Sequence, residues 1–310
     1  MVTLPPPGAP DDVGVDGVAV VVTVDVEPAA VTGGVVLATV RSRAVRDVVL
    51  QGGEVSLGCA LAYRYLEGFF GATYGATARR AVDVAAQPLP GPTLLRQGEH
   101  VDHQVLLVVP AQGLPTVDCE LVQVAWTARA RVRYEGTQHA DAPPVPLVVG
   151  GAGRGADTVS PALLQGGRRQ DHVAVGVASR RFGPGALVAG DLVVEPARPG
   201  RLHAVRAELV LLQHVPHGPW VVDNPARNPE AHPNEAETVV ARVVLAAGLP
   251  VAAGGPALRW PFELAAPRAL PAPTLVTDDF ALRWVLRGVA ERPRSYVTTS
   301  SLELDGSTVT

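Results

Sequence analysis

The amino-acid sequence predicts an all-β protein made of two tandem antiparallel β-sandwiches. Two features of the composition support this fold class: 47% of the 310 residues are hydrophobic, and Gly (32) and Pro (29) are abundant. Frequent Gly and Pro among many Val residues are typical of short strands joined by tight turns. A spacing shared by residues 95–126 and 253–284 indicates that the strands form two similar units.

The shared spacing defines the predicted domains. In each segment a Gly lies 12 residues before a Pro, and a Thr lies 10 residues before a Trp. The pairs are Gly98–Pro110 and Thr116–Trp126 in the first copy, and Gly255–Pro267 and Thr274–Trp284 in the second. We expect a disordered lead at 1–16, a first sandwich at 17–149, a Gly-rich linker at 150–171 and a second sandwich at 172–305.

The first domain is expected to begin with a strand at 18–26, where Val recurs with the two-residue period of a strand. Gly33-Gly34 then turns the chain into the next strand. The segment 68–86 is ambiguous and fits either a hairpin or an irregular crossover. The other strands expected in this domain cover 35–40, 48–50, 55–65 and 121–134, and 143–149 ends the domain.

The second domain is expected to contain seven strands and one long polar loop. The loop at 216–235 is long for a compact sandwich and holds most of the unusual residues of this half. The expected strands cover 173–178, 187–195, 202–215, 238–246, 258–264, 279–289 and 296–304.

The clearest strand, 121–134, has one apolar and one basic face. Trp126 lies on the apolar face, and Arg129, Arg131 and Arg133 lie on the other. In 280–289 the same alternation directs Trp284 inward and Arg283 and Arg287 outward. Such an arginine row could bind phosphates or acidic side chains, or it could be a solvated face that discourages aggregation. Both tryptophans are expected to pack in the core.

A Gly-rich segment follows the first domain. Gly151, Gly153 and Ala156 have the spacing of a dinucleotide-binding loop. No helix of useful length follows them, because Pro161 intervenes, and no βαβ unit surrounds them. A flexible linker is therefore the interpretation that we favour.

Charge and cysteine content limit the class of protein. The net charge of −4 gives no general attraction to nucleic acid, and all 26 basic residues are Arg, which suggests a genome of high GC content. Cys59 and Cys119 are expected to be small buried hydrophobes and not a disulfide scaffold. No signal peptide or stretch of membrane-spanning length is recognised, so a soluble cytoplasmic protein is expected.

Clusters of potential metal ligands lack a rigid spacing. His214, His217 and His232 lie near Asp223, Glu230, Glu235 and Glu237, and a smaller cluster comprises Glu99, His100, Asp102 and His103. His100 and His103 should lie on opposite faces of a strand and would not converge on one metal. Motifs of nucleophilic enzymes and phosphate-binding loops are absent. We therefore expect a protein that is not an enzyme, with no metal and no cofactor; a metal-dependent enzyme using the 214–237 region is an alternative.

These features together resemble the arrestin fold. The segments that carry the resemblance are LLRQGEHVDHQVLLVVPAQGLPT and LPVAAGGPALRWPFELAAPRALPAPT, and the resemblance extends from about 17 to 304. The chain looks most like bacterial arrestin-like proteins related to the sporulation-control family. The resemblance implies two immunoglobulin-like (arrestin-fold) sandwiches and a non-enzymatic adaptor or scaffold that binds other proteins. The phosphate-sensing residues of the family cannot be matched residue by residue, although Asp278-Asp279 invites the comparison.

The expected partner is a protein client, and a phosphorylated or acidic one would suit the arginine rows. Trp220, in the long loop, is a candidate anchor because exposed loop aromatics often mediate docking. Alternatives are a homo-oligomeric structural subunit that assembles through strand edges and peripheral contact with anionic membranes. The candidate partner-binding residues are Arg129, Arg131, Arg133, His217, Trp220, Asp223, Arg227, Arg283 and Arg287.

Overall fold

The computed structural model describes residues 19–69, 72–151, 160, 162, 171–218, 233–253, 255–293 and 295–308. Every regular element in these ranges is a β-strand, which confirms the all-β prediction. The lead predicted at 1–16, most of the linker at 150–171 and most of the loop at 216–235 lie outside the described residues.

The strands fall into two sets along the chain. The first set comprises β1 (Val20–Val26), β2 (Ala29–Val31), β3 (Val35–Ala44), β4 (Val48–Phe69), β5 (Ala72–Leu89), β6 (Thr93–Leu95), β7 (His100–Val108), β8 (Val117–Asp118), β9 (Val122–Tyr134), β10 (Gln138–Asp141) and β11 (Val145–Gly150). The second comprises β12 (His172–Val177), β13 (Arg181–Phe182), β14 (Leu187–Glu195), β15 (Gly200–Val215), β16 (Asn234–Val251), β17 (Leu258–Ala265), β18 (Leu275–Val276), β19 (Ala281–Arg292) and β20 (Ser295–Gly306).

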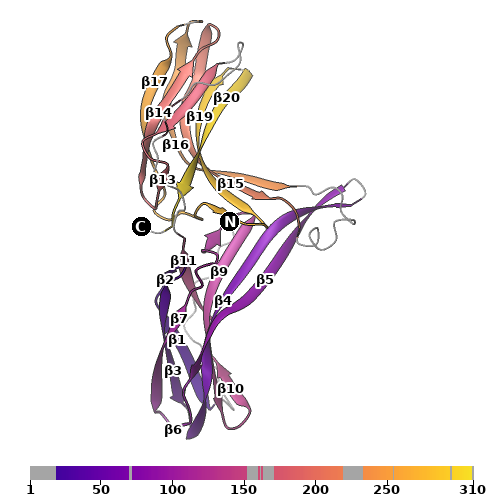
Figure 1. Ribbon diagram of the computed structural model, residues 1–310, viewed down its shortest axis with the longest axis vertical. Helices are drawn as coiled ribbons and strands as arrows, with labels where there is room; N and C mark the ends of the chain where they lie inside the picture. Colours follow the sequence, from indigo (N-terminus) through magenta and orange to yellow (C-terminus); the bar gives the residue numbers. More distant parts are fainter. Residues whose placement is uncertain are drawn as a thin grey trace.

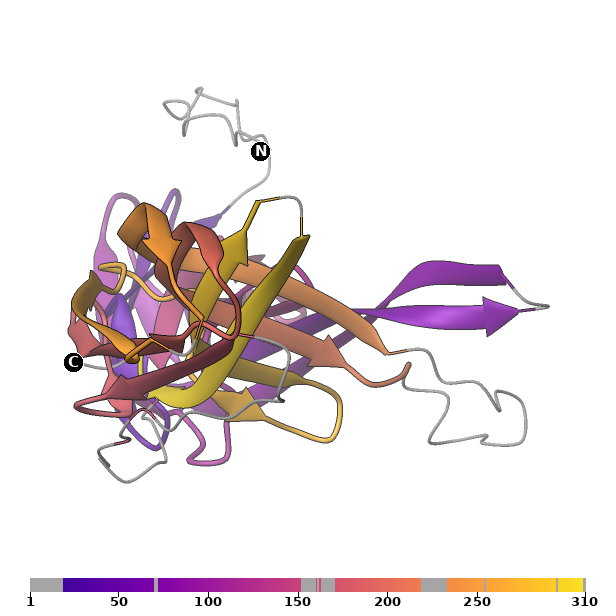
Figure 2. The same ribbon diagram turned by 90° about the horizontal axis from the view of Figure 1, so that it is seen from above.

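The two sets form sheets with the same strand order. In the first half, β1-β3-β7 is a three-stranded sheet, and the eight-stranded sheet has the order β2-β11-β9-β4-β5 with three short strands beside it. In the second half the corresponding sheets are β12-β14-β17 and β13-β20-β19-β15-β16. Figure 1 shows the first set in the lower part of the molecule and the second in the upper part. Seen from above in Figure 2, the long strands of both large sheets extend to the same side.

The equivalence of the halves extends to single hydrogen bonds around the two tryptophans. Trp126 and Trp284 are fully buried, as predicted. The Trp126 indole N–H donates to the carbonyl of Leu114 (2.9 Å), and the Trp284 indole N–H donates to that of Ala272 (3.0 Å), 12 residues upstream in both cases. The repeated sequence spacing therefore reflects a repeated local structure.

Strand register fixes which residues of the two halves correspond. Trp126 pairs with Cys59, and Trp284 pairs with Leu211, so β4 and β15 are aligned by these two positions. Two residues earlier, the strand paired with each of them has a bulge: β5 opposite the Leu57–Gly58 step in one half, and β16 opposite the Leu209–Val210 step in the other. An equivalent bulge places the extra residue of β5 and of β16 at the same site, so outer-face positions can be compared directly.

Some predicted boundaries were wrong. The strands expected at 48–50 and 55–65 are one strand, β4, because Gly52 and Gly53 form an irregularity within it and not a turn. Gly52 has a φ of +97°, and a Cβ at Gly53 would collide with the carbonyl of Arg131. The ambiguous segment 68–86 belongs to the β4–β5 hairpin. Glu235, expected in a loop, lies in β16.

The halves contact one another through backbone and buried side chains. The N–H of Leu121 donates to Oε1 of Gln213 (2.8 Å), and the Tyr63 hydroxyl hydrogen-bonds to Asp279. Burial, with the nearby Asp279 charge, raises the pKa of Tyr63 to about 12. Gly151 lies against the prolines that precede the repeated Thr116 and Thr274: a Cβ there would be 2.9 Å from Cβ of Pro115 and 3.0 Å from Cγ of Pro273. Gly151, the second residue of the predicted linker, is therefore tightly packed.

Candidate binding surface

The predicted arginine row lies on an exposed face of the eight-stranded sheet. We call this face, opposite to Trp126, the first outer face. Strict alternation along β9 buries every second residue and leaves Arg129, Arg131 and Arg133 exposed. The exposed side chains therefore stand on one face at intervals of about 6.6–6.8 Å, as the sequence predicted.

Only the middle arginine of the row has an ion-pair partner among the described residues. Arg131 donates from Nε to Oδ1 of Asp141 (2.6 Å) and from a second nitrogen to Oδ2 (3.0 Å). These hydrogen bonds raise the pKa of Arg131 and lower the pKa of Asp141. Within the described ranges, Arg129 and Arg133 make no side-chain hydrogen bond or ion pair.

A shallow groove runs beside the row. It has a volume of about 450 Å³, and its lining includes Glu54, Ala86, Pro88, Arg131 and Arg133. Small and polar side chains line it, so the guanidinium of Arg133 remains accessible from solvent. The first outer face thus offers cationic groups over an open surface.

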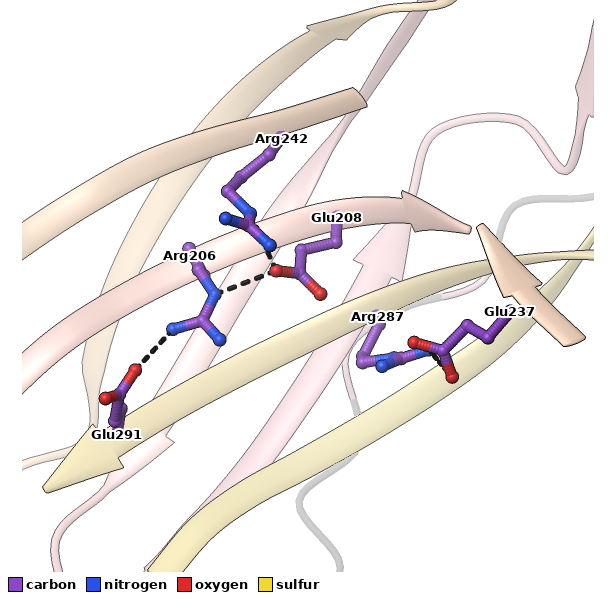
Figure 3. A network of polar contacts seen from close by, with 6 residues as sticks. All are labelled: Arg206, Glu208, Glu237, Arg242, Arg287 and Glu291. Carbon is purple, nitrogen blue, oxygen red and sulfur yellow. Dashed lines mark hydrogen bonds and ion pairs between the residues drawn. The ribbon is translucent and has the colours of Figure 1, made fainter. Parts of the chain in front are cut away.

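The corresponding face of the second half is closed by ion pairs. We call it the second outer face (Figure 3). Glu208, whose side chain is only 3% exposed, accepts hydrogen bonds from Arg206 and from Arg242, both at 2.8 Å. Arg206 also donates to Glu291 (2.7 Å). Burial alone would lower the pKa of Arg206, but the hydrogen bonds to the two glutamates outweigh it and raise that pKa.

A separate ion pair on this face spans three strands. Arg287 on β19 reaches Glu237 on β16, with 2.7 Å between nitrogen and oxygen. The hydrogen bond raises the pKa of Arg287 and lowers the pKa of Glu237. The registers place Val210 of β15 beneath the pair, and Val210 is fully buried.

The register shows why the two faces differ. Arg129 and Arg287 are equivalent, since they pair with the equivalent residues Ser56 and Glu208. The position of Glu237, which pairs with Leu212, corresponds to Ala81, which pairs with Ala60. The first half therefore has Ser and Ala where the second half has the two carboxylates that surround its arginine.

The other predicted partner-binding residues have mixed outcomes. Arg283 is exposed and lines a groove of about 440 Å³ with His214, Glu235 and other residues. Arg287 is occupied by Glu237, and Nδ1 of His217 is 3.1 Å from the carbonyl oxygen of Gly218. Trp220, Asp223 and Arg227 lie outside the described residues.

The predicted ligand clusters do not converge where the structure describes them. His214 contacts Glu235 (3.0 Å), whereas His232 and Glu230 are not described. Asp102 pairs with Arg41, and the β7 pattern places His100 and His103 on opposite faces. In the described part of the chain, no three His, Cys, Asp or Glu side chains gather as a metal site requires.

The two thiols are held in their neutral form. Burial raises the pKa of Cys59, and burial with the neighbouring Asp118 charge raises the pKa of Cys119 to about 12. A nucleophilic cysteine needs a lowered pKa. Cys119 is buried, as the sequence predicted, whereas Cys59 is only partly buried.

Sequence reasoning missed the carboxylates that pair with the arginines. Asp141 faces Arg131 because a tight turn joins β9 to β10, and Glu135 and Gly136 in that turn have φ angles of +46° and +80°. A Gly flanked by polar residues at the end of an alternating strand is a hairpin signal that could have revealed this pair. Glu208 carried no comparable signal in the sequence.

Comparison with known proteins assigns no family. The chain matches no protein-family model and no curated protein. None of the described residues belongs to a helix with the length and apolarity needed to cross a bilayer.

Proposed function

We propose that the chain is a non-enzymatic adaptor or scaffold of a bacterial cytoplasm, built of two arrestin-like β-sandwiches at 17–149 and 172–305. It binds an acidic segment of a protein client through the first outer face. The matching strand orders and the resemblance described above support the two-sandwich architecture. The arginine row of β9 supports the choice of surface and of partner.

The proposal depends on one observation: of two equivalent arginines, the one in the second half has an ion-pair partner and the one in the first half has none among the described residues. In the second half, Arg287 has a carboxylate partner and is largely buried. In the first half, Arg129 occupies the same position with Ser56 opposite and no ion-pair partner among the described residues. Guanidinium groups bind carboxylates through paired hydrogen bonds. An exposed pair of unpartnered arginines, Arg129 and Arg133, therefore suits an acidic ligand.

Binding of a labelled oligoglutamate of twelve residues, followed by fluorescence anisotropy, tests this proposal. Arg129→Ala with Arg133→Ala should raise the Kd roughly tenfold, since two exposed charge contacts contribute about 0.5–1 kcal/mol each. The double variant should also weaken the dependence of Kd on salt concentration.

The matched control is Arg43→Ala with Arg96→Ala, because both side chains are exposed and neither residue belongs to β9 or to a strand paired with it. This control removes the same charge and should change the Kd less than twofold. Equal effects of the two double variants would show attraction to charge in general, and the proposed surface would be wrong.

A further inference from the structure

The strand β5 has a free edge. It is the last strand of the eight-stranded sheet, hydrogen-bonded to β4 alone, and no described strand lies along its other side (Figure 1). Its pairing with β4 is regular from Gly58–Asp83 to Phe69–Ala72, so this stretch contains no bulge. It also contains no proline, and its one inward-pointing charge is Arg80. The edge therefore presents a row of backbone groups suited to pairing with another strand.

A crevice lies beside this edge, between the two halves. Its volume is about 230 Å³, and its walls include Leu61, Val82, Val84 and, from the second half, Phe280. Val82 is 41% exposed although it lies in the middle of β5. An added strand would continue the inner face of the sheet and place its own alternate side chains next to Val82. Those positions favour apolar residues.

The opposite side of the same edge is mainly basic, with Asp83 as its one carboxylate between Ala72 and Asp83. Arg79 lies on the outer side of β5, and Arg64 of β4 pairs with Thr77, two positions away on that side. Arg80 lies on the inner side at the crevice. All three are exposed, and among the described residues their guanidinium groups have no carboxylate partner. In a pairing of two copies of β5 centred on Arg79 and Arg80, like charges would face one another and oppose that pairing.

We propose that the free edge of β5 accepts one extended segment of a partner protein in which apolar and acidic residues alternate. Its apolar side chains occupy the crevice beside Val82, and its acidic side chains meet Arg79 and Arg64. Backbone hydrogen bonds along the edge supply affinity, and the two faces supply specificity. This inference rests on the proposed adaptor function and adds a second site with a defined partner chemistry.

Hydrogen exchange with a synthetic peptide tests the proposal. The probe is a ten-residue peptide of alternating Val and Glu; an alternating Val and Arg peptide and a Val-Glu peptide with a central Pro are its controls. The Val-Glu peptide should slow amide exchange within residues 74–84, because outward N–H groups of β5 become hydrogen-bonded. The Arg peptide and the Pro peptide should give no such protection.

Paired variants distinguish peptide binding at the β5 edge from nonspecific binding elsewhere on the protein. Val82→Glu with Arg79→Glu should raise the Kd of the Val-Glu peptide roughly tenfold, a loss of about 1.4 kcal/mol. Val108→Glu with Arg43→Glu is the matched control, since both side chains are exposed on another sheet. The control should change the Kd less than twofold.

The outcomes distinguish this inference from the proposed function. If binding depends on Arg129 and Arg133 without protection of 74–84, the edge proposal is wrong and the adaptor surface stands. Equal binding of the Pro peptide, or a dimer in light scattering whose β5 edge is already protected, also overturns the edge proposal. If neither the Val-Glu peptide nor the oligoglutamate binds, both proposals are wrong.

Discussion

The outer faces of the two large sheets have the same order of main strands and the same register around the two tryptophans but different electrostatics. On the second outer face, carboxylates surround every described arginine except Arg283, and Glu208 and Val210 are buried. On the first, Arg131 alone has a partner, and both it and Asp141 are about half exposed. One scaffold therefore supports a closed, structural face and an open, cationic one, and the difference depends on a few side chains.

Arginine–carboxylate pairs contribute differently to the free energy of unfolding on the two faces. Exposed pairs such as Arg131–Asp141 contribute about 0–1 kcal/mol, because water screens the charges and long side chains lose entropy. Removing one partner of a buried pair costs more, because it leaves a charge desolvated and uncompensated. The network around Glu208 should therefore stabilise the second half more than any pair on β9 stabilises the first.

The largest effect is expected for Glu208→Ala. This substitution removes the buried acceptor of both Arg206 and Arg242; because Arg206 keeps Glu291 and Arg242 is half exposed, the loss is that of two charged hydrogen bonds, about 2–3 kcal/mol in the free energy of unfolding. Asp141→Ala, the matched change on the first face, should cost no more than about 0.5 kcal/mol. Urea unfolding followed by far-UV circular dichroism measures both, and equal losses would contradict the contrast between the faces.

A smaller effect is expected for Arg287→Ala. It removes the side chain that bridges β19 to β16 above Val210, so packing is lost together with the ion pair. We expect a loss of about 1–2 kcal/mol in the free energy of unfolding. The equivalent Arg129→Ala should change stability by less than about 0.5 kcal/mol. A cost for Arg129→Ala as large as that for Arg287→Ala would show that the first face is also structural.

Acidification should affect the second face through Glu237. The hydrogen bond from Arg287 lowers the pKa of Glu237 from its ordinary value of 4.5, so the unfolded chain binds the proton more readily than the folded one. The resulting stability is present above pH 4.5 and is lost as the pH falls through the lower folded value. Glu237→Gln should therefore lose less stability than the wild type between pH 6 and pH 3 in urea unfolding.

The matched test of the pH dependence is Asp141→Asn on the first face. Arg131 lowers the pKa of Asp141 by hydrogen bonding, so the direction of the effect is the same. The carboxylates of Asp141 and Glu237 are about equally exposed, but Arg131 is 54% exposed whereas Arg287 is 18% exposed, so solvent screening makes the contribution of the Arg131–Asp141 pair smaller. If Asp141→Asn reduces the pH dependence of the free energy of unfolding as much as Glu237→Gln does, the two outer faces do not differ in this respect.

Alternation predicted the open face because β9 has one exposed and one buried side without interruption. The burial of Trp126 and the exposure of Arg129, Arg131 and Arg133 follow from that period alone. The limits of β14 at Leu187–Glu195 were also predicted, since turn residues flank an alternating run. The continuity of β4 was not, because Gly52-Gly53 has the composition of a turn but forms an irregularity within the strand.

The closed face could not be predicted from alternation, because a bulge in β16 reverses which alternate residues reach the outer face beyond it. Glu237 and Arg242 are five residues apart, so regular alternation would place them on opposite faces. The extra residue Val240 lies opposite the Leu209–Val210 step, and both side chains therefore reach the second outer face. Which residues face one another across strands depends on register, which single-sequence periodicity does not contain.

The smallest effect on stability should come from a substitution that gives the first face a feature of the second. Ala81→Glu places a carboxylate at the position equivalent to Glu237, with Gly58 of β4 between it and Arg129. We expect the new pair to change the free energy of unfolding by no more than about 0.5 kcal/mol, because both groups remain exposed. Its effect on binding should be larger: by occupying Arg129, it should weaken oligoglutamate binding several-fold in fluorescence anisotropy. Ala81→Gln, which adds bulk without charge, should bind nearly as the wild type does. If both variants bind equally well, the free guanidinium of Arg129 is not what distinguishes the open face from the closed one.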